Sequence, residues 1–158
     1  MKFRIAQPVD LPRLNQVIAD AISTWQVAER VRKLSRHAYQ YDESDLADGQ
    51  VLLLTDPSDE IVGVAHWGPA SRVDAPAESI NPAILHGLYL QANRHGQGLG
   101  KRLLAEAMRA ACAANHDWLT LRAQRDAEAF FRSQGFIAHD EADPPLYPRR
   151  MSQRLTQS

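Results

Sequence analysis

Apolar positions repeat with helical spacing near the start of the chain. In the segment 10–25, DLPRLNQVIADAISTW, they recur every three or four residues, at Leu11, Leu14, Val17, Ile18, Ala21 and Ile22. This period predicts an amphipathic helix with Asp10 as its N-cap and Pro12 in its first turn. The preceding segment KFRIAQ predicts a short first strand.

The next part of the chain changes from a polar pattern to an apolar one. Polar residues dominate 29–49, ERVRKLSRHAYQYDESDLADG, which predicts one or two short helices ending near Gly49. The segments 50–55 and 60–67, QVLLLT and EIVGVAHW, are apolar and flank the strong turn signal DPSD. These two segments therefore predict a β-hairpin.

Strand and helix patterns alternate in the second half. The segment 68–83 contains Pro69, Pro76 and Pro82 and is expected to be a loop. A helix is expected to run to about Ala114 with one apolar face, made of Leu99, Leu103, Ala107, Met108 and Ala111. Further strands are expected at 84–90, 118–123, 136–139 and 148–155, with a helix over 126–134 that Gly135 ends. The order predicts helices packed on a mixed, mostly antiparallel sheet.

Composition narrows the class of protein. The chain has 158 residues, enough for a single domain over 1–158. A formal net charge of -1 gives no overall attraction to nucleic acid or to an anionic membrane, so neither is expected as a partner. The one cysteine, Cys112, cannot form an internal disulfide and suits a reducing cytoplasm. We expect it to be a small, at least partly buried residue rather than a nucleophile, and we expect no metal site.

A glycine-rich stretch precedes the long predicted helix. In RHGQGLGKRLL, Gly96, Gly98 and Gly100 fall within five residues. The first turn of a helix has N–H groups without intrahelical partners and a partial positive charge, so it suits phosphate oxygens. Glycines remove Cβ atoms and allow close approach of a ligand. The sequence predicts an anion site here, with positive charge from four neighbouring residues, Arg94, His95, Lys101 and Arg102.

Three other interpretations of this stretch compete. Glycines before a helix sometimes form only a tight connection. A Walker loop requires glycine where His95 stands and Ser or Thr where Arg102 stands, so that motif fails at both ends. A Rossmann fingerprint requires G-x-G-x-x-G early in a parallel βαβ unit, whereas GQGLGK has the wrong spacing and lies late in the chain.

Two motifs at a particular spacing resemble the GNAT superfamily of N-acyltransferases. The family pattern [QR]-x-x-G-x-[GA] corresponds to HGQGLG at 95–100, preceded by the strand sequence LYL at 88–90. The family pattern A-x-x-F-Y-x-x-x-G-F corresponds to AEAFFRSQGF at 127–136. The resemblance spans nearly the whole chain. It implies the α+β GNAT fold, with α/β/α layers, a six- to seven-stranded mixed sheet and about four flanking helices.

The resemblance also implies where acetyl-CoA, the family's cosubstrate, would bind. Turn amides would hold the pyrophosphate, and backbone groups of the preceding strand would pair with the pantetheine arm as an added strand. The N–H of Leu90 would also hold the developing oxyanion. Gln124 stands where the family often has an Asn that contacts the cofactor arm. The implied cofactor residues are Leu88, Tyr89, Leu90, His95, Gly96, Gln97, Gly98, Leu99, Gly100, Lys101, Gln124 and Phe131.

The chain departs from the family pattern at two positions. His95 replaces the usual Gln or Arg, a mild change because backbone groups hold the phosphates. Phe131 replaces the Tyr that protonates the leaving thiolate in many members. A thiolate with a pKa near that of cysteine, about 8.5, leaves tolerably without a dedicated acid. Tyr147 or Tyr89 are the candidate substitutes for that acid.

A base is needed because an alkylamine with a lysine-like pKa of about 10.4 is mostly protonated at neutral pH. His86 is the leading candidate, on the strand 84–90 with Ile84, Leu88 and Leu90 on its face by simple alternation. Some family members that acetylate aromatic amines have a His there. The alternative is that His86 occupies an ordinary half-exposed strand position.

The acceptor is expected to be a primary amine of a small molecule, attacked directly in a ternary complex. The family grips its acceptor with the first two helices, the loop between them and the loop that joins the last strands. The residues here are Trp25, Arg30, Arg32, His37, Tyr39, Tyr41, Asp140, Glu141, Asp143 and Tyr147. Each of these residues alone could equally lie on a solvated surface. A protein N-terminus or lysine is a second acceptor class, and an acyl-CoA-binding module with little or no catalysis is the rival function. Homodimers are common in the family, and the last strands offer an edge for one.

Overall fold

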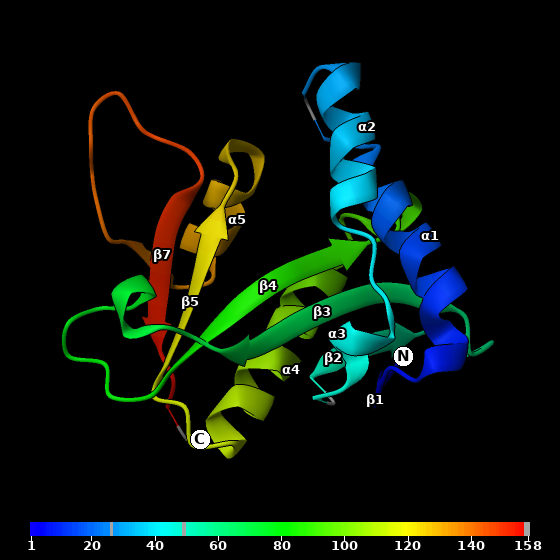
Figure 1. The fold of residues 1–158 in the computed structure, drawn as a ribbon, viewed down its shortest axis with the longest axis horizontal. Helices are drawn as coiled ribbons and strands as arrows, with labels where there is room; N and C mark the ends of the chain where they lie inside the picture. The colour runs from blue at the N-terminus through cyan, green and yellow to red at the C-terminus, as the bar shows by residue number, and fades with distance from the viewer. Residues whose placement is uncertain (26, 49, 157–158) are drawn as a thin grey trace. The chain divides into compact units, whose positions relative to one another are not determined.

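The structure is a computed structural model that describes residues 1–25, 27–48 and 50–156 (Figure 1). The hydrogen-bonding order of its strands is β1-β2-β3-β4-β5-β7-β6. The helices are α1 (Leu11–Ile22), α2 (Glu29–Ala38), α3 (Glu43–Leu46), α4 (Leu99–Ala113) and α5 (Glu128–Ser133). The strands are β1 (Lys2–Ile5), β2 (Val51–Thr55), β3 (Ile61–Pro69), β4 (Pro82–Leu90), β5 (Trp118–Ala123), β6 (Ile137–Ala138) and β7 (Arg149–Arg154). The predicted mixed, mostly antiparallel sheet is confirmed, and α3 is a single additional turn.

Two compact units divide the described chain. The first contains Met1–His66 and Gly87–Glu106, and the second contains Trp67–His86 and Ala107–Ser158. Strands β3 and β4 and helix α4 each contribute residues to both. The units are described separately below, and a single domain over 1–158 stays a prediction.

An antiparallel meander forms the sheet of the first unit. Strand β1 pairs with β2 from Lys2↔Thr55 to Ile5↔Leu52, and β2 pairs with β3, with Leu53 opposite Val64. All five residues of β2 are buried, because both faces of this strand are covered. The predicted hairpin is confirmed: its turn contains Asp59 at φ 64°. The turn is closed by Asp56, whose carboxylate accepts the N–H groups of Ser58 and Glu60 at 2.8 and 3.1 Å.

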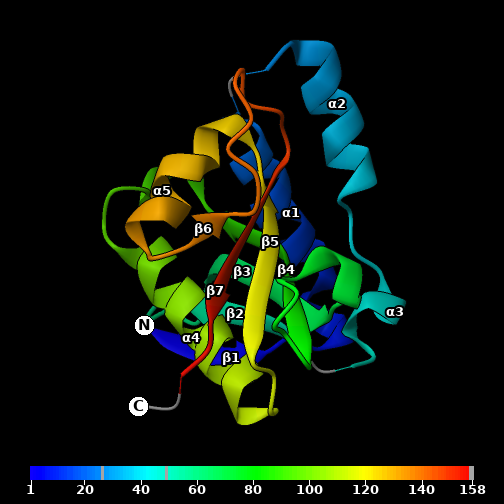
Figure 2. The same cartoon turned by 90° about the vertical axis from the view of Figure 1, so that its left-hand side faces the viewer.

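Helix α1 covers one face of this meander. Its predicted apolar stripe is buried, and it packs with Val51, Leu53, Val64 and Tyr89 in one core. The other face meets the first half of α4, where the Cδ2 of Leu103 lies beside Gly63 and Leu90. Figure 2 shows α1 and the start of α4 on opposite sides of β2 and β3. The two helices therefore hold β4 in place in this unit from both sides of the sheet.

Asp10 does not cap α1 in the predicted way. It precedes the helix, yet its side chain makes no capping hydrogen bond to it. Its carboxylate instead accepts two hydrogen bonds from the Arg4 guanidinium, at 2.8 and 2.9 Å, and one from the Gln7 N–H. The hydrogen bond from Arg4, opposed by burial, lowers the pKa of Asp10 below its usual value. Asp10 thus ties β1 to the turn before α1.

The second unit contains the parallel part of the sheet. Strand β4 pairs in parallel with β5 from Pro82↔Trp118 to Leu85↔Leu121, and β5 pairs antiparallel with β7 along its whole length. Short β6 pairs with β7, which confirms the predicted closing pair. The predicted loop 68–83 is shorter than expected, because β3 continues to Pro69 and Pro82 already begins β4. It also contains a 3₁₀ turn, Arg72–Asp74.

Asp117 fastens that loop. Its carboxylate accepts hydrogen bonds from the Ser79 hydroxyl (2.8 Å), the Ile80 N–H (2.7 Å) and the Asn81 N–H (3.0 Å). Burial alone would raise the pKa of Asp117, but these hydrogen bonds lower it below its usual value.

Across the residues that the structure describes, no helix is long and apolar enough to cross a membrane.

Candidate functional site

The glycine-rich turn leaves open space above its backbone. Gly96 and Gly98 have φ values of 79° and 75°, in the left-handed region that favours glycine. A Cβ atom added at either residue would meet nothing within 4 Å. Packing therefore does not require glycine at these two positions. The backbone conformation does, and so would a ligand that approaches the peptide groups closely.

Helix α4 begins directly at this turn. The N–H of Arg102 donates to the carbonyl of Gly98 at 3.2 Å, which makes Gly98 the residue before the first helical turn. The N–H groups of Leu99, Gly100 and Lys101 come before that bond and point out of the helix end. The helix dipole places partial positive charge at the same point. The turn can thus bind an anion through its backbone.

The positive charges around the turn are fewer than the sequence suggested. Arg94 donates to Asp56 at 3.0 Å and is neutralised by this ion pair. The Arg102 guanidinium lies over the ring of Phe3, 5.9 Å from its centroid. Lys101 and His95 are exposed, and a ring nitrogen of His95 lies 3.4 Å from the Leu90 carbonyl oxygen. Lys101 and Arg102 therefore remain as exposed cationic side chains beside the turn.

Strand β4 continues beyond its pairing with the parallel strand β5 before the chain reaches the glycine-rich turn. The register pairs with β5 stop at Leu85↔Leu121, whereas β4 continues to Leu90. Gln91 then donates its N–H to the Val62 carbonyl of β3 at 3.0 Å. Residues 88–90 of β4 lie beyond the last of these register pairs with β5. These peptide groups can accept an extended ligand as an added strand.

One edge of the Tyr89 ring lies against Gly87 of β4. A Cβ added to Gly87 would fall 2.4 Å from the ring and 2.9 Å from its hydroxyl oxygen, so the ring fills the space that glycine leaves. Tyr89 is buried, and burial together with the neighbouring Tyr39 raises the pKa of its hydroxyl above the usual value. Its hydroxyl therefore stays protonated.

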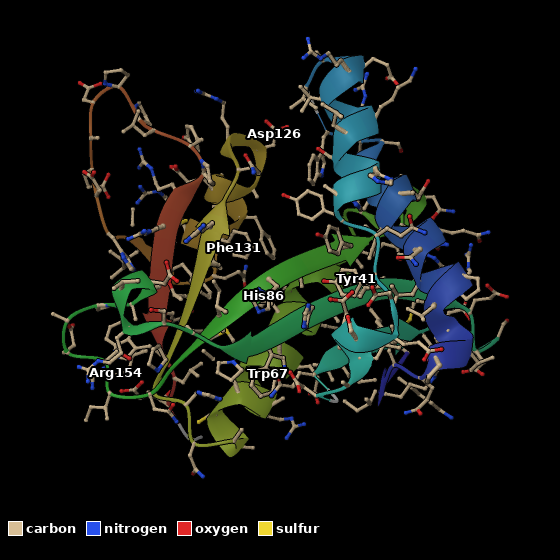
Figure 3. The ribbon with its side chains drawn as sticks, in the orientation of Figure 1. Tyr41, Trp67, His86, Asp126, Phe131 and Arg154 are labelled. Carbon is tan, nitrogen blue, oxygen red and sulfur yellow. The ribbon has the colours of Figure 1, made fainter. Side chains whose placement is uncertain are left out.

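His86 lies on β4 in the second unit and is exposed (Figure 3). Its strand neighbour Leu85 is buried, while Ile84 is half-buried. A base at this position would be in contact with solvent and could exchange its proton with water. The assignment of His86 as the base stays a prediction.

The second unit also contains Gln124 and Phe131, two of the predicted cofactor residues. Gln124 is exposed and directly follows β5. Phe131 is buried, and its ring makes edge-on contacts with Phe130 and Phe136 at centroid distances of 5.2 and 5.6 Å. Phe131 is thus part of an aromatic core, and it has no proton to donate.

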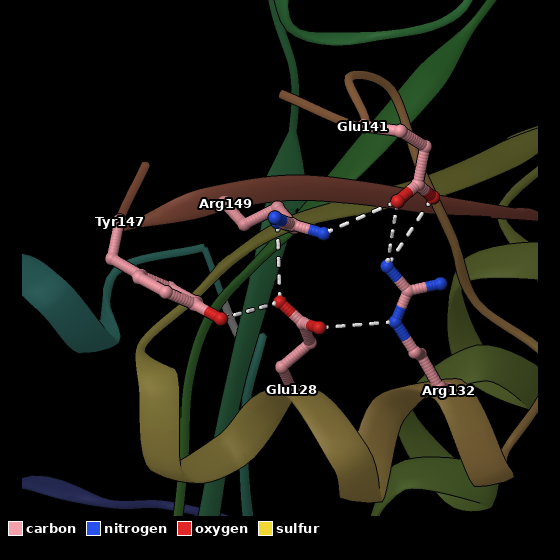
Figure 4. A network of polar contacts seen from close by, with 5 residues as sticks. All are labelled: Glu128, Arg132, Glu141, Tyr147 and Arg149. Carbon is pink, nitrogen blue, oxygen red and sulfur yellow. Dashed lines mark hydrogen bonds and ion pairs between the residues drawn. The ribbon is translucent and has the colours of Figure 1, made fainter. Parts of the chain in front are cut away.

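Tyr147 is bound into a charged network (Figure 4). Its hydroxyl donates to Glu128 at 2.9 Å, and Glu128 also accepts from Arg149 and Arg132, both at 3.1 Å. Glu141 pairs with the same two arginines. The Arg132 hydrogen bond, together with Tyr147 and Arg149, lowers the pKa of Glu128 below its usual value. The network ties the segment 139–148 to α5 and β7.

Aromatic side chains gather in the first unit, and sequence reasoning missed one of them. The ring of Trp25 contacts Tyr39 edge-on at 5.8 Å, and Tyr39 lies 6.5 Å from Tyr89. The Tyr41 hydroxyl lies 3.0 Å from Nδ1 of His66, a residue that no local pattern distinguished. Of the other predicted acceptor residues, Arg32 donates to the Trp25 carbonyl at 2.9 Å and pairs with Glu29. Arg30 and His37 are exposed on α2, and Asp140 and Asp143 are exposed in the second unit.

Solved structures share this fold. PaiA N-acetyltransferase from Thermoplasma acidophilum, solved with coenzyme A, is 17% identical with a TM-score of 0.78, over 97% of this chain and 98% of that one. A GCN5-related N-acetyltransferase from Rhodopseudomonas palustris is 21% identical, TM-score 0.75, over 98% and 95%. A GNAT acetyltransferase from Brucella melitensis, solved with acetyl-CoA, is 16% identical, TM-score 0.65, over 99% and 88%.

Sequence comparison gives the family. A search of curated protein sequences finds no match. The family model of the GNAT acetyltransferase domain matches residues 18–143, most of the chain. Together with the mixed sheet and the glycine turn before α4, this match shows that the protein belongs to the GNAT acetyltransferase family and is an acyltransferase.

Proposed function

We propose that the protein transfers the acetyl group of acetyl-CoA to a primary amine of a small molecule. The observation that carries this proposal is the pair of left-handed glycines, Gly96 and Gly98, whose backbone faces open space where α4 begins. The two structural neighbours solved with coenzyme A and acetyl-CoA support the choice of cosubstrate. Family membership supports the type of reaction.

The diphosphate of the cosubstrate binds at the turn. The amides of Leu99, Gly100 and Lys101 donate to phosphate oxygens, and Gln97 and Gly98 supply the preceding peptide groups. The Lys101 ammonium is exposed beside them and adds a charge-assisted contact. The pantetheine arm lies along residues 88–90 of β4 as an added strand. Gln124 and Phe131 stay cofactor residues predicted from the family resemblance.

The amine attacks the thioester carbon directly. A C–N bond forms while the C–S bond breaks, the acetyl group passes to nitrogen, and coenzyme A leaves as the thiolate. The Leu90 N–H stabilises the charge on the carbonyl oxygen in the tetrahedral intermediate. His86 takes the proton that the amine loses, directly or through a water.

The thiolate needs no strong acid to leave. Its pKa is close to that of a cysteine thiol, about 8.5, so it is a tolerable leaving group near neutral pH. Phe131 cannot protonate it. The Tyr147 hydroxyl is the proposed donor from the sequence, but it would first have to leave Glu128.

Two other assignments are outcomes of the same test. A protein N-terminus or lysine would be a different acceptor for the same chemistry. A binding module would hold acetyl-CoA and release no thiol in the presence of any amine.

The proposed site of action is the cytoplasm, on the ground of the single cysteine, Cys112. A homodimer stays a prediction.

The experiment is a thiol-release assay with acetyl-CoA, run against small primary amines and against peptides with free N-termini or lysines. We expect amine-dependent thiol release, and initial-velocity lines that intersect when both substrates are varied. Turnover with peptides alone would replace the small-molecule acceptor by a protein. Acetyl-CoA binding without turnover of any acceptor would establish the binding module. Parallel lines would contradict direct attack.

A further inference from the structure

A polar cavity lies beside the segment that leads into the glycine turn. Its volume is about 420 Å³, within the range of roughly 300–1,000 Å³ that small-molecule sites occupy. Helix α1 forms one wall, and Gln91 with the start of the 3₁₀ turn Ala92–Arg94 forms the other, all within the first unit. The lining residues are Arg13, Gln16, Asp20, Gln91, Ala92 and Asn93. These residues are not among the predicted cofactor, acceptor or catalytic residues, so the cavity is separate from the site described above.

Helix α1 places opposite charges at the two ends of its wall. Arg13 and Asp20 are seven residues apart, which is two helical turns, so they lie on the same face of the helix. Gln16 lies between them on that face. The rise of the helix separates the two charged residues by about 10 Å. The cavity therefore has a guanidinium at one end and a carboxylate at the other.

The Arg13 guanidinium can bind a further anion. Its Nη1 donates to the side-chain oxygen of Gln16 at 3.1 Å. Its Nε lies 3.4 Å from the Glu60 carboxylate, but this nitrogen is buried and makes no hydrogen bond within the described part of the chain. The Glu60 side chain is 61% exposed, so solvent screens this ion pair and it neutralises Arg13 only weakly. A guanidinium has five N–H donors, and a buried donor without an acceptor favours a ligand that supplies one.

The Asp20 carboxylate can bind a further cation. One of its oxygens, Oδ2, accepts the N–H of Ala92 at 2.7 Å, which fixes the side chain against the opposite wall of the cavity. A carboxylate has two oxygens and about four acceptor sites, so one backbone donor does not satisfy it. Asp20 is exposed, and an ammonium group can therefore reach it from solvent.

The rest of the lining is neutral and forms hydrogen bonds. Gln16, Gln91 and Asn93 have side-chain amides, which both donate and accept. An apolar ligand would bury these amides without partners, which is unfavourable. A ligand with a single charge would pair with Arg13 or with Asp20 but not with both. A ligand with one carboxylate and one ammonium group pairs with both ends of the cavity.

The distance between the two charged residues sets the length of such a ligand. Each ionic hydrogen bond spans about 3 Å. Subtracting both from the helical rise of about 10 Å leaves about 4 Å or more between the charged groups of the ligand. In an α-amino acid the ammonium and the carboxylate are bonded to the same carbon, so they are too close together to reach Arg13 and Asp20 at once. A chain with the two groups at opposite ends can reach both.

We propose that this cavity binds a linear ω-amino acid, with its carboxylate on Arg13 and its ammonium group on Asp20. The proposal goes beyond the proposed function, because the site needs neither acetyl-CoA nor acetyl transfer. Ala92, which Asp20 holds, lies four residues before Gly96. The bound molecule therefore lies against the segment that enters the proposed diphosphate site.

Calorimetry on the protein without acetyl-CoA tests the proposal with four ligands: 5-aminopentanoate, its isomer 2-aminopentanoate, pentanoate and pentylamine. The two isomers have the same atoms and charges and differ in the spacing of their charged groups. We expect 5-aminopentanoate to bind at least about ten-fold more tightly than each of the other three. Arg13→Gln should reduce its advantage over pentylamine below about three-fold and keep its advantage over pentanoate. Asp20→Asn should do the reverse, and its amide oxygen can still accept the Ala92 N–H.

Lys33→Gln and Asp48→Asn are the matched controls, because each removes one charge from an exposed position of the first unit and should keep all three preferences. A melting curve checks that each variant is folded. Absence of saturable 5-aminopentanoate binding would overturn the proposal, and so would equal binding of its isomer. Preferences that survive both cavity substitutions would place the ligand elsewhere and overturn it too. Failure of the thiol-release assay would remove the proposed function and leave this result unchanged, because the titrations contain no acetyl-CoA.

Discussion

Arg94 and Asp56 join the β2–β3 hairpin to the segment that enters the glycine turn. Their side chains meet at 3.0 Å, and Asp56 is the more buried of the two, with 12% of its side chain exposed against 30% for Arg94. The same carboxylate closes the hairpin turn through its other oxygen. A loop distant in sequence thus positions the backbone proposed to hold the diphosphate.

Asp56→Asn tests this positioning. The amide oxygen can still accept the Ser58 and Glu60 N–H groups, but the amide nitrogen would face the Arg94 guanidinium without attraction. We expect the free energy of unfolding to fall by at most about 1 kcal/mol, as for other partly exposed ion pairs. The KM for acetyl-CoA should rise about three-fold or more, with little change in kcat.

Asp59→Asn is the matched control, because it lies in the same turn and changes the net charge equally. Asparagine tolerates the left-handed conformation that Asp59 adopts. The KM for acetyl-CoA should therefore stay at the wild-type value in this variant. Equal effects of the two substitutions would mean that overall charge, and not the ion pair, governs binding.

The lowered pKa of Asp117 predicts that this residue stabilises the fold at neutral pH and no longer does so in acid. Its pKa is lowered in the folded protein, so it stabilises the fold above its unfolded pKa of about 3.9 and loses that effect as pH falls through the folded value. We expect Asp117→Asn to be less stable than wild type at pH 7, with the difference narrowing below about pH 4. Urea unfolding at several pH values measures this. The exposed Glu78→Gln, in the same loop, should show no such convergence.

His86→Gln tests the proposed base. A positioned general base contributes about 10²–10⁴-fold to rate, so kcat/KM should fall by at least about a hundred-fold. The rise of kcat/KM with pH across the neutral range should also disappear. His139→Gln removes another histidine of the second unit, next to Ser152, and should keep the wild-type pH profile. An unchanged profile in His86→Gln would assign His86 to an ordinary strand position.

Tyr147→Phe separates structure from catalysis in the network of Figure 4. It removes the hydroxyl that donates to Glu128 but keeps the ring, which lies 4.6 Å from the Arg125 guanidinium. We expect a lower melting temperature and a kcat within about three-fold of wild type, because the thiolate can leave unaided. A fall in kcat without loss of stability would instead assign the proton donation to Tyr147.

Local patterns predicted the elements well. Helix α1 and its stripe, the hairpin after DPSD, and α4 from the glycine turn to one residue short of Ala114 all follow from spacing that a single element determines. The order of the elements and two short motifs were enough to indicate the family. The structure extends this by showing that Gly96 and Gly98 have positive φ and open surroundings.

Side-chain partners far apart in sequence were not predictable. Asp10 prefers the Arg4 guanidinium to the helix end, and Arg94 is neutralised by Asp56, 38 residues away. His66 of β3 meets Tyr41 because the fold brings β3 next to the segment that follows α2. Such pairs depend on which strands and helices come together, and periodicity within one element contains no information about that.

The most direct test of the account is the dissociation constant of coenzyme A for two variants of one residue, measured by calorimetry. Asn and Asp have the same shape and both tolerate the left-handed conformation of Gly98, so Gly98→Asn and Gly98→Asp differ only in charge. If the diphosphate rests on the amides at the start of α4, Gly98→Asp should bind at least about ten-fold more weakly than Gly98→Asn, because a carboxylate there repels it. Equal dissociation constants for the two variants would contradict the account.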